Sequence, residues 1–305
     1  MTAAPGRAAA GRFAPVLAAA LLAATTLAGQ QTRPSPGVTG EWHLIVLGIA
    51  QDGGIPHLGC EQEICRSIRE GRRKPERVAS LGLLNTALGK AYLFDATPDF
   101  KSQLQTLTGG HPPDGIFLTH GHIGHYTGLM YLGRESIDAQ HVPVYGTEKM
   151  KAYLTTNGPW SLLVSRGNID LQVVEPDTPI ALDEGIRVTA FTVPHRDEFT
   201  DTVGYLIEGP HKKVLFIPDI DQWQKWSRDI REVAGKADVA FLDGTFASAS
   251  EVPGRSITDI PHPLIPATRE LLKGLPTQLW FIHLNHTNTE LDAPDVAKDG
   301  QTIVM

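Results

Sequence analysis

The sequence predicts an α/β fold in which two β-sheets pack together and helices cover their outer faces. Apolar runs of strand length are concentrated early and late in the chain, and helical patterns dominate the middle, an order that favours this arrangement. No linker or shift in composition divides residues 41–305, so we expect one domain there. The chain is 41% hydrophobic and 20% charged, which is ordinary for a globular domain and excludes wholesale disorder. One apolar run, at the N-terminus, approaches membrane length, which excludes a multispan membrane protein.

The individual elements follow from apolar runs and from the residues that interrupt them. Strand-like runs occur at residues 43–49, 81–86, 91–94, 115–118, 186–193, 203–208, 214–217, 239–242 and 279–282. Helical patterns occur at residues 98–107, 147–156, 223–234 and 266–274. Pro98 suits the first turn of the first of these helices. Gly89 and Lys90 separate two strand runs as in a hairpin, and a Gly-rich loop at residues 51–54 closes the first strand.

The N-terminus is typical of a secretory signal peptide. Arg7 and Arg12 precede an apolar stretch from Phe13 to Ala28, and small residues follow it, as in cleaved export signals. The alternative is an uncleaved membrane anchor, for which this stretch is short. We therefore predict a signal peptide at residues 1–29, a flexible linker at residues 30–40 and an exported domain at residues 41–305. The mature protein is expected to be periplasmic or secreted, without membrane contact.

The charge of the chain bears on its partners. The formal net charge is −7, and the sequence contains no basic block, which argues against nucleic acid as a partner because the phosphate backbone attracts clustered Lys and Arg. We expect a small-molecule substrate instead. The oligomeric state is not readable from the sequence.

Three histidines in one short segment predict a metal site. An apolar strand leads into His120 and His122, whose period-two spacing directs both side chains to the same side. His125 follows three residues later, where the chain turns into a helix. Imidazole is a favoured ligand of zinc and similar divalent ions. The alternative, three unrelated surface histidines, requires a coincidence at three specified positions.

This segment resembles the HxHxDH signature of the metallo-β-lactamase superfamily, with Gly124 where that family has an aspartate. Further motifs occur in the family's order, each at the end of an apolar run: Val193-Pro194-His195, Phe216-Ile217-Pro218-Asp219 and Phe281-Ile282-His283. The chain is most similar to coenzyme PQQ synthesis protein B-like metallohydrolases, through Asp95-Ala96-Thr97-Pro98-Asp99 with Gln103, and through residues 201–204, 243–246 and 283–288. The resemblance implies a four-layer αββα sandwich. Proteins similar to that biosynthetic protein tend to lack the early histidines, which this chain keeps.

The resemblance also implies two adjacent metal sites. The first would use His120, His122, His195 and Asp219, and the second would use His125, Asp219 and His283. The second site lacks the carboxylate that Gly124 has replaced, so we expect one firm zinc site and one weaker site. Asp52, in the Gly-rich loop, or His286 would fill the gap. The same ligand types also hold iron or manganese.

The implied chemistry is hydrolysis by metal-bound hydroxide of an ester, lactone, amide or phosphodiester. Asp219 would hold the metals and orient the nucleophile, and His286 or His262 would handle the proton. Two alternatives stay open. One is a PQQ-biosynthesis-like protein or non-haem iron oxygenase, and the other is a non-catalytic metal-binding or carrier protein. The retained histidines and the signal peptide place the hydrolase first.

Three further candidates lie near these motifs. His57, Cys60 and Cys65 follow the first glycine loop, where similar proteins carry a structural zinc. A disulfide between the two cysteines is as well supported in an exported protein, and free thiols are the third alternative. Asp95 either caps the following helix or, as the resemblance implies, lies beside the metal site. Arg196 adjoins His195 and is a candidate for substrate contact.

Overall fold

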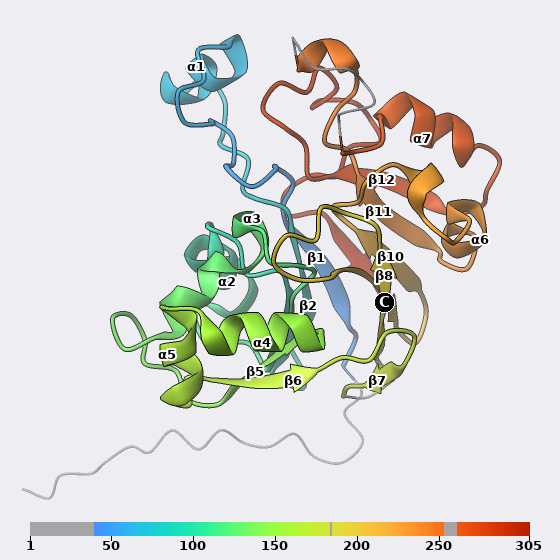
Figure 1. The fold of residues 1–305 in the computed structure, drawn as a ribbon. Helices are drawn as coiled ribbons and strands as arrows, with labels where there is room; N and C mark the ends of the chain where they lie inside the picture. Colours follow the sequence, from blue (N-terminus) through green and yellow to red (C-terminus); the bar gives the residue numbers. More distant parts are fainter. Residues whose placement is uncertain (1–39, 184, 253–260) are drawn as a thin grey trace, which may run out of the picture. The chain divides into compact units, whose positions relative to one another are not determined.

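The computed structural model describes residues 40–183, 185–252 and 261–305, so the predicted signal peptide and nearly all of the predicted linker lie outside the described residues. Two mixed β-sheets pack face to face (Figure 1). The first sheet has the order β13-β1-β2-β3-β4-β5-β6, and the second has the order β12-β11-β10-β9-β8-β7. In the described ranges, no helix has the length and hydrophobicity needed to cross a membrane.

The strands are short, and each sheet combines parallel and antiparallel pairs. The first sheet contains β1 (His43–Gly48), β2 (Ser80–Asn85), β3 (Lys90–Phe94), β4 (Gly115–Phe117), β5 (Val142–Gly146), β6 (Ile169–Val173) and β13 (Thr302–Val304). The second contains β7 (Pro179–Ala181), β8 (Arg187–Val193), β9 (Thr202–Glu208), β10 (Lys213–Ile217), β11 (Val239–Asp243) and β12 (Gln278–Ile282).

Helices form the two outer layers. The α-helices are α1 (Glu63–Arg69), α2 (Phe100–Thr108), α3 (Ile123–Tyr126), α4 (Glu148–Thr156), α5 (Trp160–Ser165), α6 (Ile230–Ala234) and α7 (Ile265–Leu271). Short 3-10 helices are η1 (Thr127–Leu132), η2 (Trp223–Lys225) and η3 (Ala249–Glu251). Helices α2, α4 and α5 cover the outer face of the first sheet, and α6 and α7 cover that of the second (Figure 1).

Three apolar clusters fill the three interfaces between these layers. The central cluster lies between the sheets and includes Phe94, Phe117, Tyr205, Phe216 and Phe241. A second cluster joins the first sheet to α2, α4 and α5, and a third joins the second sheet to η2 and α6. Because both faces of each sheet are covered, the central strands are apolar on both sides, whereas the edge strands β6 and β7 are partly exposed. The predicted four-layer αββα sandwich is therefore confirmed.

Strand β10 shows how the two faces are divided. Val214 and Phe216 belong to the central cluster, whereas Leu215 and Ile217 belong to the outer one. This alternation follows from the period of two along a strand. All nine predicted strands are present in the structure, with ends within a residue or two of the predicted bounds.

Two expectations about the middle of the chain were wrong. The segment between residues 118 and 186 contains three strands, β5, β6 and β7, in addition to its helices. Pro143 interrupts the strand signal of β5, and β6 and β7 are edge strands. The helix expected at residues 223–234 divides into η2 and α6, because Trp226 is extended and its indole N–H donates to the Thr192 carbonyl at 2.9 Å.

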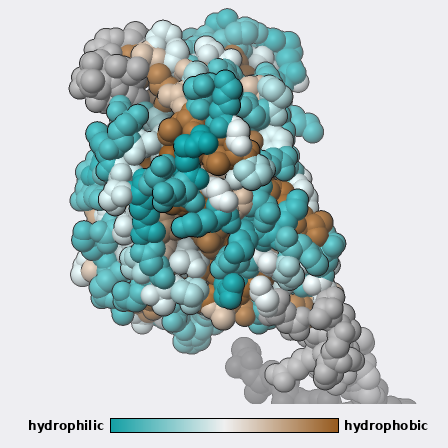
Figure 2. Space-filling view, turned by 90° about the vertical axis from the view of Figure 1, so that its right-hand side faces the viewer, coloured by the Kyte–Doolittle hydropathy of each residue, from teal (hydrophilic) through white to brown (hydrophobic). Residues whose placement is uncertain are grey.

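The outer surface is mostly polar on the side that carries α6 and α7. Viewed from that side, hydrophilic side chains cover most of the drawn surface, and hydrophobic ones appear in interrupted stretches between them (Figure 2). This pattern is ordinary for the surface of a globular domain.

One edge of the sandwich collects the ends of the strands that matter for function. Strand β4 pairs in parallel with β3 and β5, and β10 pairs in parallel with β11, which in turn pairs with β12. Their carboxyl ends therefore meet along the same edge, where loops of open α/β sheets commonly form ligand sites.

Candidate metal centre

Four ligand atoms from three loops form the first donor set. His120 and His122 follow β4, His195 follows β8, and Asp219 follows β10. His120 Nε2 lies 2.9 Å from His122 Nδ1, which lies 3.3 Å from His195 Nε2. Asp219 Oδ2 lies 3.3 Å from both His120 Nε2 and His195 Nε2. The four atoms thus face a common point.

The shorter separations within the first donor set are close to those around a four-coordinate metal ion. Zinc with ligand distances of about 2.0–2.1 Å places neighbouring donor atoms about 3.3 Å apart. Four of the six separations in the first donor set are 2.9–3.3 Å, and all six are within 4.8 Å. Three imidazoles and one carboxylate are ligands that zinc accepts, so both the chemistry and the spacing suit a divalent ion.

A second donor set lies beside the first and contains Asp52, His125 and His283. Asp52 Oδ1 lies 3.4 Å from His125 Nε2 and 3.8 Å from His283 Nε2. Asp219 Oδ2 lies 3.9 Å from each of these two imidazole nitrogens. Asp219 therefore adjoins both sets, and the second set is slightly wider than the first.

Several polar atoms of these residues are buried without any hydrogen-bond partner among the described residues. They are Asp52 Oδ1, His125 Nε2, His195 Nδ1, Asp219 Oδ1 and His283 Nε2. Leaving such groups unsatisfied costs about 1–3 kcal/mol each. Those of the second set point at one another across its centre, an arrangement that a cation would satisfy.

Two aspartate–threonine pairs, one from each sheet, hold the histidines from behind. In the first sheet, Asp95 Oδ2 accepts from His125 Nδ1 at 2.7 Å, and its other oxygen accepts from the Thr119 amide at 2.8 Å. The Thr119 hydroxyl lies 3.0 Å from His120 Nδ1. Such partners fix the tautomer and orientation of ligand imidazoles. Asp95 therefore supports the metal centre, and the capping role considered for it is not observed.

The second sheet repeats this arrangement. Asp243 Oδ1 accepts from the Thr245 hydroxyl at 2.7 Å, and that hydroxyl lies 3.0 Å from His283 Nδ1. Asp243 Oδ2 lies 2.8 Å from His262 Nδ1, which is also 3.3 Å from Asp219 Oδ1. His262 is buried and belongs to a third possible donor group with Asp219 and His283.

His122 has a different partner. Its Nε2 lies 2.7 Å from Glu198 Oε2, so its Nδ1 is the atom that faces the donor set. The Glu198 side chain is 45% exposed, whereas Asp95 and Asp243 are fully buried. The three supporting carboxylates thus differ in their access to water.

Burial and neighbouring charges keep His120 and Asp219 in the protonation states that bind metal. Burial holds the pKa of His120 well below its ordinary value, so its imidazole is neutral. Burial raises the pKa of Asp219, but the neighbouring His195, His283 and His262 outweigh this effect and hold it well below the ordinary value. A neutral imidazole and an ionised carboxylate are the forms that bind metal.

His125 is the exception in this field. Burial lowers its pKa, but Asp95 and Asp52 raise it to about 10. The pKa of Asp52 is correspondingly held below its ordinary range by His125 and His283, against the opposing effect of burial. Without a metal ion, this pair is therefore an ion pair.

Two residues of the site have left-handed backbone conformations. Asp95 has φ = 67° and His283 has φ = 66°, each directly after a strand. For residues other than glycine this conformation costs about 1–3 kcal/mol, and it is concentrated at functional sites. In each sheet, one site residue thus follows a strand in the left-handed conformation.

A cavity of about 380 Å³ adjoins the centre. Arg196, His57, His286 and His262 contribute to its lining. His262 also lines a second cavity of about 590 Å³, together with Trp223, and it therefore lies between the two spaces. Both cavities are connected to the donor residues through His262, which lies 3.3 Å from Asp219, and they are the candidate space for a substrate.

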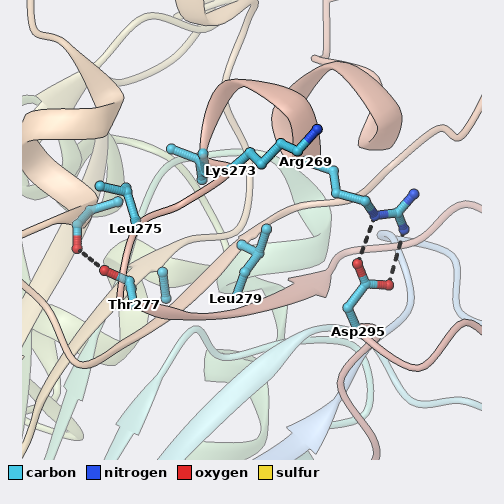
Figure 3. Close-up of a pocket in the computed structure, with 9 residues that line it drawn as sticks. Arg269, Lys273, Leu275, Thr277, Leu279 and Asp295 are labelled. Carbon is cyan, nitrogen blue, oxygen red and sulfur yellow. Dashed lines mark hydrogen bonds and ion pairs between the residues drawn. The ribbon is translucent and has the colours of Figure 1, made fainter.

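A third cavity, of about 260 Å³, lies at α7 and β12. Arg269 and Asp295 at its rim form two hydrogen bonds of 2.8 and 3.0 Å with each other (Figure 3). Leu275 and Leu279 contribute apolar lining. Unlike the other two cavities, it has no lining residue in any of the three possible donor groups, His262 included, so we assign it no part in the chemistry.

The structure brings all six predicted ligands together, in two sets that Asp219 joins. His286 lies elsewhere: its ring stacks on His57 at 4.4 Å in the cavity wall, outside both donor sets. Cys60 and Cys65 form a disulfide. His286 and the two cysteine sulfurs also lie within 4.8 Å of one another.

Sequence reasoning missed several supporting residues. Thr119 directly precedes His120, Asp243 ends β11 and Thr245 follows it, so their position at strand ends was an available signal. Glu198 gave no such signal, because its contact with His122 joins two loops that are far apart in the sequence.

Comparisons with known proteins agree with this geometry. The family model of the beta-lactamase superfamily domain matches residues 90–284. Coenzyme PQQ synthesis protein B of Methylococcus capsulatus is 28% identical over 306 residues, covering 85% of this chain and 99% of that protein.

Solved structures share the fold at lower identity. Zn²⁺-bound PqqB from Methylobacterium extorquens has a TM-score of 0.73 and 22% identity, covering 86% of this chain and all of that chain. A diphosphatase from the PhnP family has a TM-score of 0.65 and 22% identity, covering 87% and 97% of the two chains.

Proposed function

The chain belongs to the beta-lactamase superfamily, and on that premise we propose that it is a metal-dependent hydrolase of small-molecule substrates. One observation carries the proposal: the four atoms of the first donor set all lie within 4.8 Å of one another, with four of their separations at 2.9–3.3 Å, next to His262, which lines a cavity. A zinc-bound relative in fold and a diphosphatase of the same fold support it.

A divalent ion held there supplies Lewis acidity and lowers the pKa of water toward neutrality. The protein's own groups provide the remaining chemistry. Asp219 keeps one oxygen toward both donor sets and places its other oxygen 3.3 Å from His262 Nδ1. Asp219 therefore connects the ligands to a residue that lines the substrate space.

We assign proton transfer to His262 rather than to His286. Asp243 contacts His262 Nδ1 at 2.8 Å, which fixes the proton on that nitrogen and leaves Nε2 for exchange with the substrate. A carboxylate behind an imidazole is a common arrangement in general acid–base catalysis. His286 stacks on His57 and has no carboxylate partner among the described residues.

The cavity favours a substrate with an anionic group. Arg196 lines it, and within the described ranges its guanidinium forms one ion pair, with Glu198 at 3.8 Å. A guanidinium pairs well with carboxylate or phosphate oxygens. Among the ester, lactone, amide and phosphodiester bonds considered, we therefore favour a phosphodiester or an ester beside a carboxylate.

A step in the synthesis of a PQQ-like coenzyme is the second candidate function. The observation that favours it is the 28% identity to coenzyme PQQ synthesis protein B over nearly the whole of that protein. Histidines and a carboxylate also bind iron, so an oxygen-dependent reaction belongs to this alternative. The identity of the metal and the effect of removing oxygen separate it from hydrolysis.

The test uses the protein purified from its full chain without added metal. We expect zinc to be retained, and a screen of phosphodiesters, esters, lactones and amides to show turnover that a His120→Ala/His122→Ala variant loses. Iron, with oxygen-dependent turnover, would favour the second candidate. Bound metal without turnover of any substrate would favour a carrier protein.

We also propose that the protein acts outside the cytoplasm after removal of residues 1–29. Cell fractionation and N-terminal sequencing of the mature protein test this proposal. Recovery of the intact N-terminus in the membrane fraction would support the anchor instead.

A further inference from the structure

We propose that Asp52 replaces the aspartate missing at position 124 and is the carboxylate ligand of a second metal ion. The second metal site would then be complete, although its usual carboxylate position holds glycine. The inference rests on the proposed metal-dependent function and concerns which residue of this chain supplies the charge.

The donor geometry carries the first step. Asp52 Oδ1 lies 3.4 Å from His125 Nε2 and 3.8 Å from His283 Nε2. Both imidazole side chains are fully buried, and their Nε2 atoms have no hydrogen-bond partner among the described residues. Their Nδ1 atoms are already held by Asp95 and Thr245. Their remaining nitrogens and the Asp52 oxygen therefore face one small space.

Steric exclusion carries the second step. A Cβ atom on Gly124 would lie 2.0 Å from Asp52 Oδ1 and 2.8 Å from Asp52 Cα. Gly124 lies within α3 and is not among the glycines with positive φ, so its backbone does not require glycine. The glycine is needed for room, because a side chain at position 124 and the Asp52 carboxylate would occupy the same volume.

The loop that carries Asp52 is anchored to the strand end that carries His283. The Gln51 amide donates to the Leu284 carbonyl at 2.8 Å, and the Leu284 amide donates to the Ile49 carbonyl at 2.8 Å. Asn285 and Gln51 are also joined through their side chains. Contacts of the residues directly before Asp52 thus hold this loop beside the strand end that carries one of the imidazoles it faces.

The charge of the second metal ion explains why a carboxylate at position 52 is needed when position 124 holds glycine. Each divalent ion needs anionic ligands to offset its charge, and Asp219 alone would have to serve both sets. The Asp52 carboxylate restores one anion to the second set. We therefore expect two firmly bound ions rather than the one firm and one weak ion inferred from Gly124 alone.

The experiment compares metal content in variants of the full chain, loaded with zinc and dialysed. We expect two zinc ions per chain in the wild type and in two controls, Asp292→Asn and Gly158→Ala. Asp292 is an exposed carboxylate, and Gly158 has open space around its Cβ position. Asp52→Asn and Gly124→Ala are expected to hold one, with the second affinity falling by more than about 100-fold, since even outer partners contribute 10–100-fold.

Cobalt loading gives a readout that does not depend on turnover. Two adjacent Co²⁺ ions couple magnetically, so the paramagnetic resonance signal of the wild type should be weaker per cobalt than that of Asp52→Asn. If Asp52→Asn does not fold, Gly124→Ala tests the same carboxylate by displacing it. One ion in the wild type, or two in Asp52→Asn or Gly124→Ala, would overturn the inference. In either case, hydrolysis that depends on His120 and His122 would leave the proposed function standing.

Discussion

Substitution of Asp95 by asparagine tests whether the buried carboxylates set the tautomers of the ligand histidines. The Asp95 side chain is fully buried, accepts from the Thr119 amide at 2.8 Å and lies 2.7 Å from His125 Nδ1. Asparagine has the same shape and keeps the first contact through its oxygen. Its amide group then faces a nitrogen that must bear a proton if Nε2 is to bind metal.

Two effects of known size follow from this change. Loss of a hydrogen bond between charged groups costs about 1.5–3 kcal/mol. Breaking a buried ion pair costs about 3–5 kcal/mol, but Asp52 remains as a second anion 3.4 Å from His125 Nε2. We therefore expect the metal-free Asp95→Asn variant to lose about 2–3 kcal/mol of unfolding free energy. The inverted tautomer should also weaken metal binding by about 10–100-fold.

Urea unfolding in the presence of a chelator measures the loss of unfolding free energy in the metal-free variant. Competition with a chromophoric chelator measures the loss of zinc affinity. Asp292→Asn is the control, because Asp292 is 75% exposed and such surface pairs contribute at most about 1 kcal/mol. If Asp95→Asn unfolds within about 0.5 kcal/mol of the wild type and binds zinc equally well, the tautomer argument is refuted.

Three further predictions concern the edge of the centre. Glu198→Gln should weaken zinc binding by about 10–100-fold, because the carboxylate orients His122, and zinc titration would show no change if Glu198 were only a surface residue. Arg196→Gln should raise KM for anionic substrates by about tenfold or more and leave that for neutral analogues unchanged, as steady-state kinetics can measure. Burial lowers the pKa of His262, but Asp243 and Asp219 raise it to about 9. Its contribution to stability is therefore complete below about pH 6.5 and is lost as the pH rises through 9. Unfolding of the metal-free protein at several pH values should show a shallower alkaline fall in His262→Gln, and an unchanged slope would contradict the assignment.

The layers of the fold could be predicted from the sequence because the central strands are buried on both faces and therefore form apolar runs. Strand β10, for example, supplies Phe216 to the central cluster and Leu215 to an outer one, and the resulting unbroken apolar run is visible in the sequence. The edge strands β6 and β7 have half-exposed faces and no such run. Their pairing depends on neighbours that are distant along the chain, so local patterns could not identify them.

The ligands were predictable to the extent that they follow strands. His120, His195, Asp219 and His283 each come after an apolar run, and parallel strands bring such positions to one edge. The contact of Glu198 with His122 and that of Asp52 with His125 depend on how separate loops come together at that edge. No spacing rule within the sequence encodes this approach, and only the structure shows that Asp52 rather than His286 faces His125.

The exchange between positions 124 and 52 follows from what a metal site requires. A divalent ion needs a set number of donors and enough negative charge at one point in space, and it is indifferent to which segment supplies them. The loop after β1 and helix α3 both reach the second donor set, and the Asp52 carboxylate and a side chain at position 124 exclude each other there. A glycine at a signature position therefore does not by itself indicate a lost site. The informative observation is whether another carboxylate occupies the space that the glycine leaves.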